Sequence, residues 1–451
     1  MKESSLRSLK DSLLMFMIAI VFGYTLIDVF VNHLTQHAYL GYGTQSNDPS
    51  LLVCSFVLIG ITILHLPKKI LKVSDFILIL LFWLAYMPIM VIAPKQEFDF
   101  SEIMQILFSI FMSFNLMIYI SNLKIFKLNF SIDRSIYELL RNAFFLLYIL
   151  LNLYIIFIYR SSFNLAGYEE IYTQRELVGT AITEKNIIVN YTGCFLQWAF
   201  NPFLIALGLT EKKISLVFMG TIGEILIYAT LANKGVLLSP LFILAFYYFV
   251  IADKNKNKSL KTASVIISLM LITYLLYLYN LNYFTYEFFF LIFVRVFGIV
   301  PAMFASYIHF FNANSFTYYS HINIVSKFIQ YPYEKSLGEE VGFFLVGDGH
   351  LDANAGFWAS DGYGGLGYLG IVIIGIVIGF IFILFNSICQ KKLKLSCTAF
   401  IPFTMLLCNG SLFTSLLTGG GLLVLIFIFF SSCEVRETFK RRTPNSIILE
   451  T

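Results

Sequence analysis

The stretch FFFLIFVRVFGIVPAMFASYIHFF, residues 288–311, is long and apolar enough to cross a lipid bilayer, yet it contains Arg295, Gly298 and Pro301. About twenty apolar residues suffice for a membrane-spanning helix. A crossing here would put the long polar loop that follows in the cytoplasm and the basic residues 390–394 outside. Whether this one segment crosses therefore decides the topology of the whole chain.

Apolar runs of similar length recur along all 451 residues, of which 58% are hydrophobic and 13% charged. This composition is typical of a polytopic membrane protein. We expect an all-α fold, a single transmembrane domain over residues 1–451 with about twelve membrane-spanning helices of about twenty residues each. The expected spans are residues 13–31, 51–66, 76–93, 103–120, 143–159, 188–209, 214–231, 236–252, 262–281, 365–388, 397–417 and 421–432.

Lysine and arginine residues gather in alternate connectors between these spans, whereas the loop 32–50 has neither. Basic connectors stay in the cytoplasm, so both termini are expected there. The alternation continues beyond residue 311 only if the segment 288–311 does not cross, but lies in the outer interface as a broken or re-entrant pair of helices. The basic connectors are residues 67–69, 124–141, 211–213, 253–261, 391–394 and 436–442.

The remaining composition excludes several classes of protein. The net charge of +4 is spread over connectors and forms no basic face, so no nucleic-acid partner is expected. All six cysteines lie in or beside apolar runs without a CxxC pair, so neither a disulfide framework nor a zinc site is expected. The apolar run after MKESSLRSLKDS is too long for a signal peptide and is expected to be the first transmembrane helix.

Two large outer loops, residues 160–187 and 282–364, hold most of the charge on the non-cytoplasmic side. Arg295 is the most informative cation, because a guanidinium among apolar neighbours is costly unless it is paired. Arginine binds phosphoryl oxygens through parallel hydrogen bonds, and lysine acts as a point charge. Such cations at the mouth of a membrane cavity suit a ligand that is both lipid and anion. The candidate phosphate-binding residues are Arg160, Arg175, Lys234 and Arg295.

Several of these cations also have a simpler interpretation. Arg160 ends a helix and could snorkel to the interface. Lys234 could be an ordinary turn cation, and Arg175 could pair with Glu176 in solvent. Three further residues are assigned structural places only: His309 and His321 as interfacial or loop histidines, and Glu224, within TIGEILIYAT, as facing the bundle interior.

The stretch GDGHLDANAGFWASDGYGGLGYLG, residues 347–370, is glycine-rich and leads directly into an apolar span. Its residues Asp348, His350 and Asp352 are spaced by two, so in an extended segment they point to one side. They could form a divalent metal site or a cluster that holds a general base. The aromatic residues Phe357, Trp358 and Tyr363 could stack on a sugar ring. The alternative is a loop whose carboxylates and glycines only shape its own turns.

The whole-length pattern resembles bacterial O-antigen polymerases of the Wzy type, the oligosaccharide repeat-unit polymerases. The resemblance rests on about twelve spans, cytoplasmic ends and two large outer loops. Its local match is NAGFWASDGYGGLGYLG, residues 354–370, which is similar to the Asp-x-Tyr-x-x-x-Gly-x-x-Gly helix entry of many such polymerases. Related O-antigen ligases carry a His-Asn pair before a similar entry. Here Asn354 has roughly that place, and His350 lies four residues earlier.

The resemblance implies a C-type membrane glycosyltransferase, independent of metal and cofactor, at the outer face of the bacterial inner membrane. It would lengthen undecaprenyl-pyrophosphate-linked oligosaccharides, with the active site facing the periplasm and a chain-length-regulating co-polymerase as a possible partner. The alternatives are an O-antigen ligase and a flippase for the same lipids. The general-base candidates are His350, Asp352 and Asp361; the sugar-binding candidates are Asn354, Trp358 and Tyr363; the pyrophosphate candidates are the four cations above.

Overall fold

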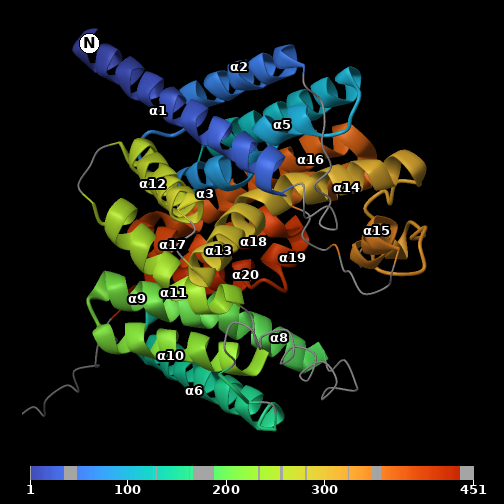
Figure 1. Cartoon of the computed structure of the whole chain (residues 1–451). Coiled ribbons are helices and arrows are strands. Elements are labelled where there is room, and N and C mark those ends of the chain that lie inside the picture. The colour runs from blue at the N-terminus through green and yellow to red at the C-terminus, as the bar shows by residue number, and fades with distance from the viewer. Residues whose placement is uncertain are drawn as a thin grey trace, which may run out of the picture.

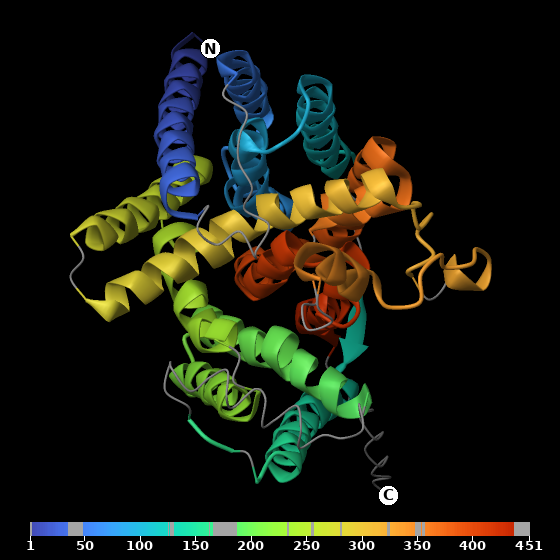
Figure 2. The same ribbon diagram turned by 45° about the vertical axis from the view of Figure 1, so that its right-hand side comes forward.

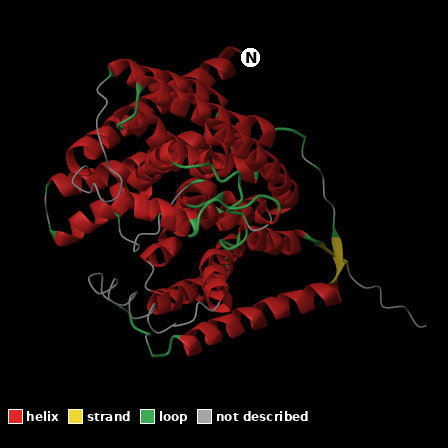
Figure 3. Ribbon diagram, turned by 90° about the vertical axis from the view of Figure 1, so that its right-hand side faces the viewer, coloured by secondary structure: helices red, strands yellow, loops and turns green. Residues whose placement is uncertain are grey.

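The computed structural model describes residues 2–34, 48–124, 126, 130–161, 163–165, 187–231, 234–253, 257–279, 282–322, 325–347, 353 and 357–436. These residues form an all-α membrane protein, with one short parallel pair of strands at the edge (Figures 1 and 3). The helices of the first half are α1 (Lys2–Val29), η1 (Phe30–Leu34), α2 (Pro49–His65), α3 (Val73–Leu81), η3 (Phe82–Tyr86), α4 (Met87–Ile92), η4 (Ala93–Lys95), α5 (Phe100–Ser121), α6 (Arg134–Ile158), α8 (Ile187–Phe195), η5 (Leu196–Phe200), α9 (Asn201–Glu211) and α10 (Ile214–Leu231).

The second half continues in the same way and ends in the short strand pair. Its helices are α11 (Lys234–Phe246), η6 (Tyr247–Ile251), α12 (Lys258–Leu278), α13 (Tyr283–Phe289), η7 (Phe290–Gly298), α14 (Ile299–Ala313), η8 (Val325–Lys327), α15 (Leu337–Val346), α16 (Trp358–Cys389), η9 (Gln390–Lys392), α17 (Leu393–Ala399), α18 (Ile401–Asn409), α19 (Leu412–Leu416) and α20 (Gly421–Ser432). The strands β1 (Ser131–Asp133) and β2 (Glu434–Arg436) pair in parallel.

Ten helical segments of the described chain are long and apolar enough to cross a membrane. Two shorter apolar helices, Pro49–His65 and Gly235–Ile251, match two further expected spans. The prediction of an all-α polytopic membrane protein is therefore confirmed. The long segments are Leu9–Leu34, Val73–Lys95, Phe100–Ser121, Arg134–Ile158, Ile188–Glu211, Ile214–Leu231, Lys258–Leu278, Tyr283–Ala313, Trp358–Ala399 and Leu412–Ser432.

The segment Val73–Lys95 lies at the centre of the bundle and is entirely buried within the protein. By contrast, only 17% of the most apolar window of Arg134–Ile158 is buried, so α6 presents most of its surface to lipid. Helices α5 and α16 form another close pair beside the centre. A Cβ atom at Gly379 would lie 2.8 Å from Cβ of Ile120, so glycine permits their close approach.

The connectors expected in the cytoplasm contact one another at one end of the bundle. The backbone N–H of Lys258 donates to the carbonyl of Lys68 at 2.8 Å, and the Asn257 amide donates to Asp11 at 2.9 Å. The Lys391 ammonium lies 2.8 Å from the carboxylate of Glu434. Segments far apart in the sequence are thus gathered on the same face, in agreement with the alternation of basic connectors.

The segment 283–313 is one continuous helical run, α13–η7–α14, and the expected break at Gly298 and Pro301 is wrong. The π-helical turns of Phe290–Gly298 change the helical register just before Pro301, and the helix continues through the proline. Figure 2 shows this run crossing the C-terminal end of α1.

The contacts of this long helix place it along the ends of its neighbours that lie opposite the basic connectors, here called the outer ends. A helix that passed from one face to the other would meet opposite ends of the neighbouring spans. Instead, its beginning, middle and end contact residues at the outer ends of three spans: His33 in η1, Gln96 directly after η4, and Glu102 in the first turn of α5. These contacts are Phe289 with the ring of His33 at 6.1 Å, the carbonyl of Pro301 with the amide of Gln96 at 3.1 Å, and Asn312 with Glu102 at 2.9 Å.

The expected span 397–417 is not a single helix, and that prediction is wrong. The chain turns at Phe400, where α17 ends and Pro402 occupies the first turn of α18. It turns again at Gly410, whose backbone is extended. Short helices α17, α18 and α19 therefore stand where one span was expected, and Leu412–Ser432 forms the last long segment.

Candidate functional site

The first turns of α16 form the centre of the candidate site, at the outer end of the bundle. The helix bends at Leu366 and Gly367, and Gly367 has a positive φ of 62°. Within the bend, a Cβ atom at Gly370 would lie 1.9 Å from the carbonyl oxygen of Gly362. The close approach of these two turns requires glycine, which explains why this entry is glycine-rich.

The segment 316–322 of the second outer loop packs onto this bend. The backbone N–H groups of Thr317 and Tyr318 donate to the carbonyls of Gly364 and Gly365 at 2.9 and 3.1 Å. A Cβ atom at Gly365 would lie 2.5 Å from the Tyr319 ring, so the ring rests directly on the glycine backbone. Loop and helix entry therefore form one structural unit.

Backbone strain is concentrated in the same loop. Tyr318 and Tyr319 have φ values of 49° and 62°, a left-handed conformation that non-glycine residues rarely adopt. Consecutive residues in this conformation persist only where the surrounding contacts hold them, and such strain is common at functional sites. Here the contacts with α16 hold them.

The loop brings His321 to Asp361 of α16. The Nε2 atom of His321 lies 2.8 Å from Oδ1 of Asp361, and its Nδ1 atom lies 2.9 Å from the Thr317 hydroxyl. The side chain of Asp361 is only 5% exposed. Its second oxygen, Oδ2, is buried and has no hydrogen-bond partner among the described residues. One carboxylate oxygen is therefore held by histidine, while the other is enclosed by protein and lacks a described donor.

The interpretation of His321 as an interfacial or loop histidine understates its role, because it is paired with a buried carboxylate. The other histidine given this interpretation, His309, lies on helix α14 and stacks on Phe98 with ring centroids 4.5 Å apart. Tyr319 completes the surroundings of the pair. Burial, reinforced by the nearby charge of Asp361, raises the pKa of Tyr319 to about 12. Its hydroxyl thus stays protonated at neutral pH.

The predicted sugar-stacking residues are covered by protein in this structure. Trp358 is fully buried, with its ring 4.6 Å from Phe357 and 6.4 Å from Phe114 between centroids. Tyr363 is 3% exposed and donates to the amide oxygen of Asn312 at 3.1 Å. Neither ring presents a free face to a sugar, since both pack into the outer end of the core.

Three other candidates, His350, Asp352 and Asn354, lie outside the described residues, as does Asp348. Between them, Ala353 is held in place by two hydrogen bonds. Its N–H donates to the carbonyl of Gly338 at 2.8 Å, and its carbonyl accepts from the Tyr307 hydroxyl at 3.3 Å. The chain therefore passes beside α14 and α15 on its way to α16.

The candidate cations differ in their placement. Arg295 is exposed on η7, where its guanidinium lies 5.9 Å from the Phe290 ring, and no ion pair joins it to a described carboxylate. Its neighbours in the sequence are apolar, and the π-helical turn directs residues 292–294 into the core and residue 295 outward. Arg160 is exposed beyond the end of α6, 4.8 Å from the Phe157 ring.

The other two cations are less completely described. Lys234 begins α11, and only its backbone is described. Arg175 lies outside the described residues. None of the contacts within the described part of the chain joins a candidate cation to the His321–Asp361 pair.

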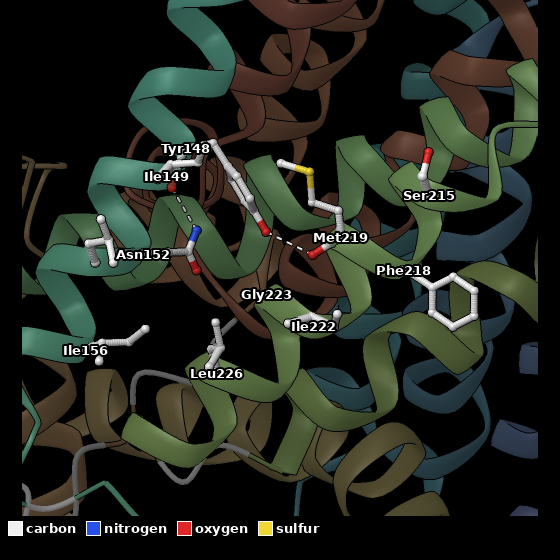
Figure 4. Close-up of a pocket in the computed structure, with 11 residues that line it drawn as sticks. Tyr148, Ile149, Asn152, Ile156, Ser215, Phe218, Met219, Ile222, Gly223 and Leu226 are labelled. Carbon is white, nitrogen blue, oxygen red and sulfur yellow. Dashed lines mark hydrogen bonds between the residues drawn. The ribbon is translucent and has the colours of Figure 1, made fainter.

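A groove of about 510 Å³ lies between α6 and α10 (Figure 4). Its walls are mainly apolar and include Ile149, Phe218 and Leu226. Helix α6 carries the lining from Tyr148 to Ile156, and Arg160 follows one turn beyond Ile156. The sequence gives no direct signal for this groove, since it arises from the separation of two helices that are distant in the chain.

Comparisons with protein-family models, with curated proteins and with solved structures find no match. Within the described segments, no group of three histidine, cysteine, aspartate or glutamate side chains could hold a metal ion. The site is thus defined by its own geometry: a buried carboxylate paired with histidine, at a glycine-rich helix entry, on the outer end of a membrane bundle.

Proposed function

We propose that this protein is a glycosyltransferase of the bacterial inner membrane that polymerises undecaprenyl-pyrophosphate-linked oligosaccharide repeat units, with its active site facing the periplasm. The observation that carries the proposal is the His321–Asp361 pair. It combines a buried carboxylate oxygen that lacks a described partner with a histidine partner, at the outer end of a transmembrane helix. The resemblance of residues 354–370 to the helix entry of O-antigen polymerases supports the same reaction.

The reaction joins two lipid-linked glycans. A hydroxyl of the acceptor sugar attacks the anomeric carbon of the growing glycan, and the bond between that carbon and the pyrophosphate oxygen breaks. Asp361 Oδ2 accepts the hydroxyl proton, and undecaprenyl pyrophosphate leaves with the bonding electron pair. A carboxylate within hydrogen-bond reach can act as such a general base. The products are a lengthened lipid-linked glycan and free undecaprenyl pyrophosphate.

His321 serves as a positioning residue. Its Nε2 atom holds Asp361 Oδ1, which leaves Oδ2 as the oxygen available to the acceptor. The Thr317 hydroxyl, itself held at the carbonyl of Gly364, contacts the other ring nitrogen and fixes the orientation of the imidazole. An orienting partner of this kind raises the fraction of molecules in which the base is correctly aligned.

Charge at the leaving group requires fixed cations, because negative charge grows on the pyrophosphate as the bond breaks. Arg295 and Arg160 are exposed and have no ion pair in the described chain, so both are free to bind phosphate oxygens. Arg175 and Lys234 are proposed for the same role from the sequence. The apolar groove that leads along α6 to Arg160 suits a ligand with a long hydrocarbon chain and a phosphate at one end.

The test uses purified protein in liposomes with an undecaprenyl-pyrophosphate repeat unit. A ladder of lengthened lipid-linked glycans is expected on a gel. Transfer only after lipid A core is added would instead make the protein a ligase. Movement of the lipid across the bilayer without any lengthening would make it a flippase. Protein that is folded but gives none of these products would contradict the proposal.

A further inference from the structure

A second buried carboxyl group lies within the membrane-spanning part of the bundle. Glu224 of α10 is completely buried, and neither of its carboxyl oxygens has a hydrogen-bond partner among the described residues. An isolated ionised carboxylate in such surroundings is very unfavourable, and it is neutralised by a proton or paired with a cation. Ionisable residues inside a membrane are rare and commonly mark functional sites.

The group that faces Glu224 is the side-chain amide of Asn201 at the start of α9. Both polar atoms of this amide, Oδ1 and Nδ2, are also buried without a partner in the described structure. Helices α9 and α10 come close together here: a Cβ atom at Gly220 would lie 2.6 Å from the Asn201 carbonyl oxygen, and one at Gly223 only 2.1 Å from Asn201 Oδ1. Two glycines thus bring the amide and the carboxyl group together.

Helix α6 closes the third side of this site. The Tyr148 hydroxyl donates to the carbonyl of Met219 at 3.0 Å, and the Asn152 amide donates to the carbonyl of Tyr148 at 2.8 Å (Figure 4). Asn152 Oδ1 remains without a partner among the described residues, as does Nε2 of Gln197, one turn before Asn201. Polar side chains of α6 and α9, Tyr148 and Asn201, therefore lie near the carboxyl group.

The charged groups of the packed helices lie elsewhere. Lys213 pairs with Glu211 at the cytoplasmic end of α10, 2.7 Å apart. Tyr148 is the titratable side chain of α6 that interacts with Glu224. Helix α11 begins at Lys234, whose side chain is outside the description. No ion pair to Glu224 occurs in the described part of the chain.

We propose that Glu224 and Asn201 form a proton-binding site inside the membrane, in which a neutral carboxylic acid pairs with the amide. The acid O–H donates to Asn201 Oδ1, and Asn201 Nδ2 donates to the acid carbonyl. One proton thereby satisfies all four unpartnered atoms in a complementary pair. An ionised carboxylate would leave Asn201 Oδ1 facing another bare oxygen, which is unfavourable in a low-dielectric interior.

A proton fits this site better than a metal cation does. A monovalent cation would require oxygen ligands on every side, but the Asn201 amide that faces Glu224 carries two N–H groups at Nδ2. These donors would repel a cation, whereas each can donate to a carboxyl oxygen. The donor and acceptor groups therefore match a neutral acid.

Infrared spectroscopy of the purified protein in lipid nanodiscs tests the site without any substrate. The difference spectrum between wild type and Glu224→Gln is expected to contain the carbonyl band of a protonated carboxylic acid at neutral pH. In Asn201→Leu, the same band is expected at higher frequency, because its hydrogen bond is lost. Glu224→Gln preserves the size of the side chain and can form an amide–amide pair with Asn201, so it is expected to fold. If Asn201→Leu does not fold, Gln197→Leu is measured in its place.

The outcomes separate the two possible ligands. A protonated-acid band that sodium chloride leaves unchanged supports the proposal. A band that disappears when sodium replaces a large organic cation at constant pH would identify a sodium site and overturn it. The absence of any such band between wild type and Glu224→Gln would show that Glu224 is ionised, and would overturn it as well.

Discussion

Two buried carboxyl groups, Asp361 and Glu224, have opposite surroundings. Asp361 lies at the outer end of α16, with one oxygen on His321 and the other without a partner among the described residues. Glu224 lies within α10, faces an amide and has no described cationic partner. Asp361 therefore has a hydrogen-bonding partner of its own, whereas a carboxyl group in an apolar interior without a cation is neutralised by a proton.

The two carboxyl groups differ in which part of the chain supplies their partners. Loop 316–322 supplies the partner of Asp361, so this carboxylate depends on a loop that packs onto the first turns of α16. Glu224 receives partners only from neighbouring helices, so it is suited to a proton that remains inside. We therefore propose different roles for the same type of side chain, a general base in one region and a proton-binding site in the other.

Replacing Asp361 is expected to have the largest effect on activity. Asp361→Asn retains the shape of the side chain but removes the proton acceptor, so the polymerisation rate should fall roughly 10²–10⁴-fold. Initial rates of glycan lengthening in liposomes measure this. Asp133→Asn is the control, since Asp133 is an exposed carboxylate beside the strand pair. Equal rates for Asp361→Asn and the control would show that Asp361 has no part in the reaction. The proposed difference between Asp361 and Glu224 would then be wrong.

Arg295→Ala should abolish detectable polymer while the protein still inserts and accumulates normally. The expected loss is about 10²–10³-fold, because a fixed cation at the leaving group is removed. Chain lengths on a gel, together with the amount of membrane protein, measure it. Lys335→Ala is the matched control, an outer-loop cation that lies 5.3 Å from the Phe343 ring. Normal chain lengths in Arg295→Ala would remove this residue from the pyrophosphate site.

His321→Ala should have a smaller effect than Asp361→Asn. We expect kcat to fall about 10- to 100-fold with little change in KM, because the base loses its orientation but remains present. His321→Gln keeps a donor near Asp361 and should recover part of the rate. Steady-state kinetics of the two variants show whether His321 acts as a positioning residue or as the base. A loss as large as that of Asp361→Asn would assign the proton transfer to His321 instead.

The smallest effects concern the glycines that shape the entry to α16. Gly370→Ala places a Cβ atom 1.9 Å from the carbonyl of Gly362 and should destabilise the protein by about 1–3 kcal/mol. Gly347→Ala has open space around it and costs only the strain of its positive φ, about 1 kcal/mol. Thermal unfolding in detergent compares them. Equal unfolding temperatures would mean that the close turns at the site are not required.

The spans were predictable because apolar length alone determines which segments can cross a bilayer. The breaks were not, because they depend on local backbone geometry. Pro301 and Gly298 suggested a break where π-helical turns keep one helix, and the largely apolar composition of residues 397–417 concealed the turn at Phe400.

The candidate site was predictable only in part. Asp361 was identified because it lies in a recognisable helix entry, but its partner was missed, since His321 is separated from it by 40 residues. The spacing of Thr317 and His321 by four residues gives only a weak signal of their contact. For Glu224 the interior position was predictable from its apolar neighbours. Its pairing with Asn201 was not, because it depends on how α9 and α10 approach.

The most direct test of the reaction at Asp361 is a single-turnover transfer in liposomes that contain one labelled donor and one acceptor repeat unit. We predict that wild-type protein forms one lengthened lipid-linked product and releases one undecaprenyl pyrophosphate. In the same assay Asp361→Asn should bind the donor but form the product far more slowly than the wild type. Transfer by Asp361→Asn at the wild-type rate would contradict the account.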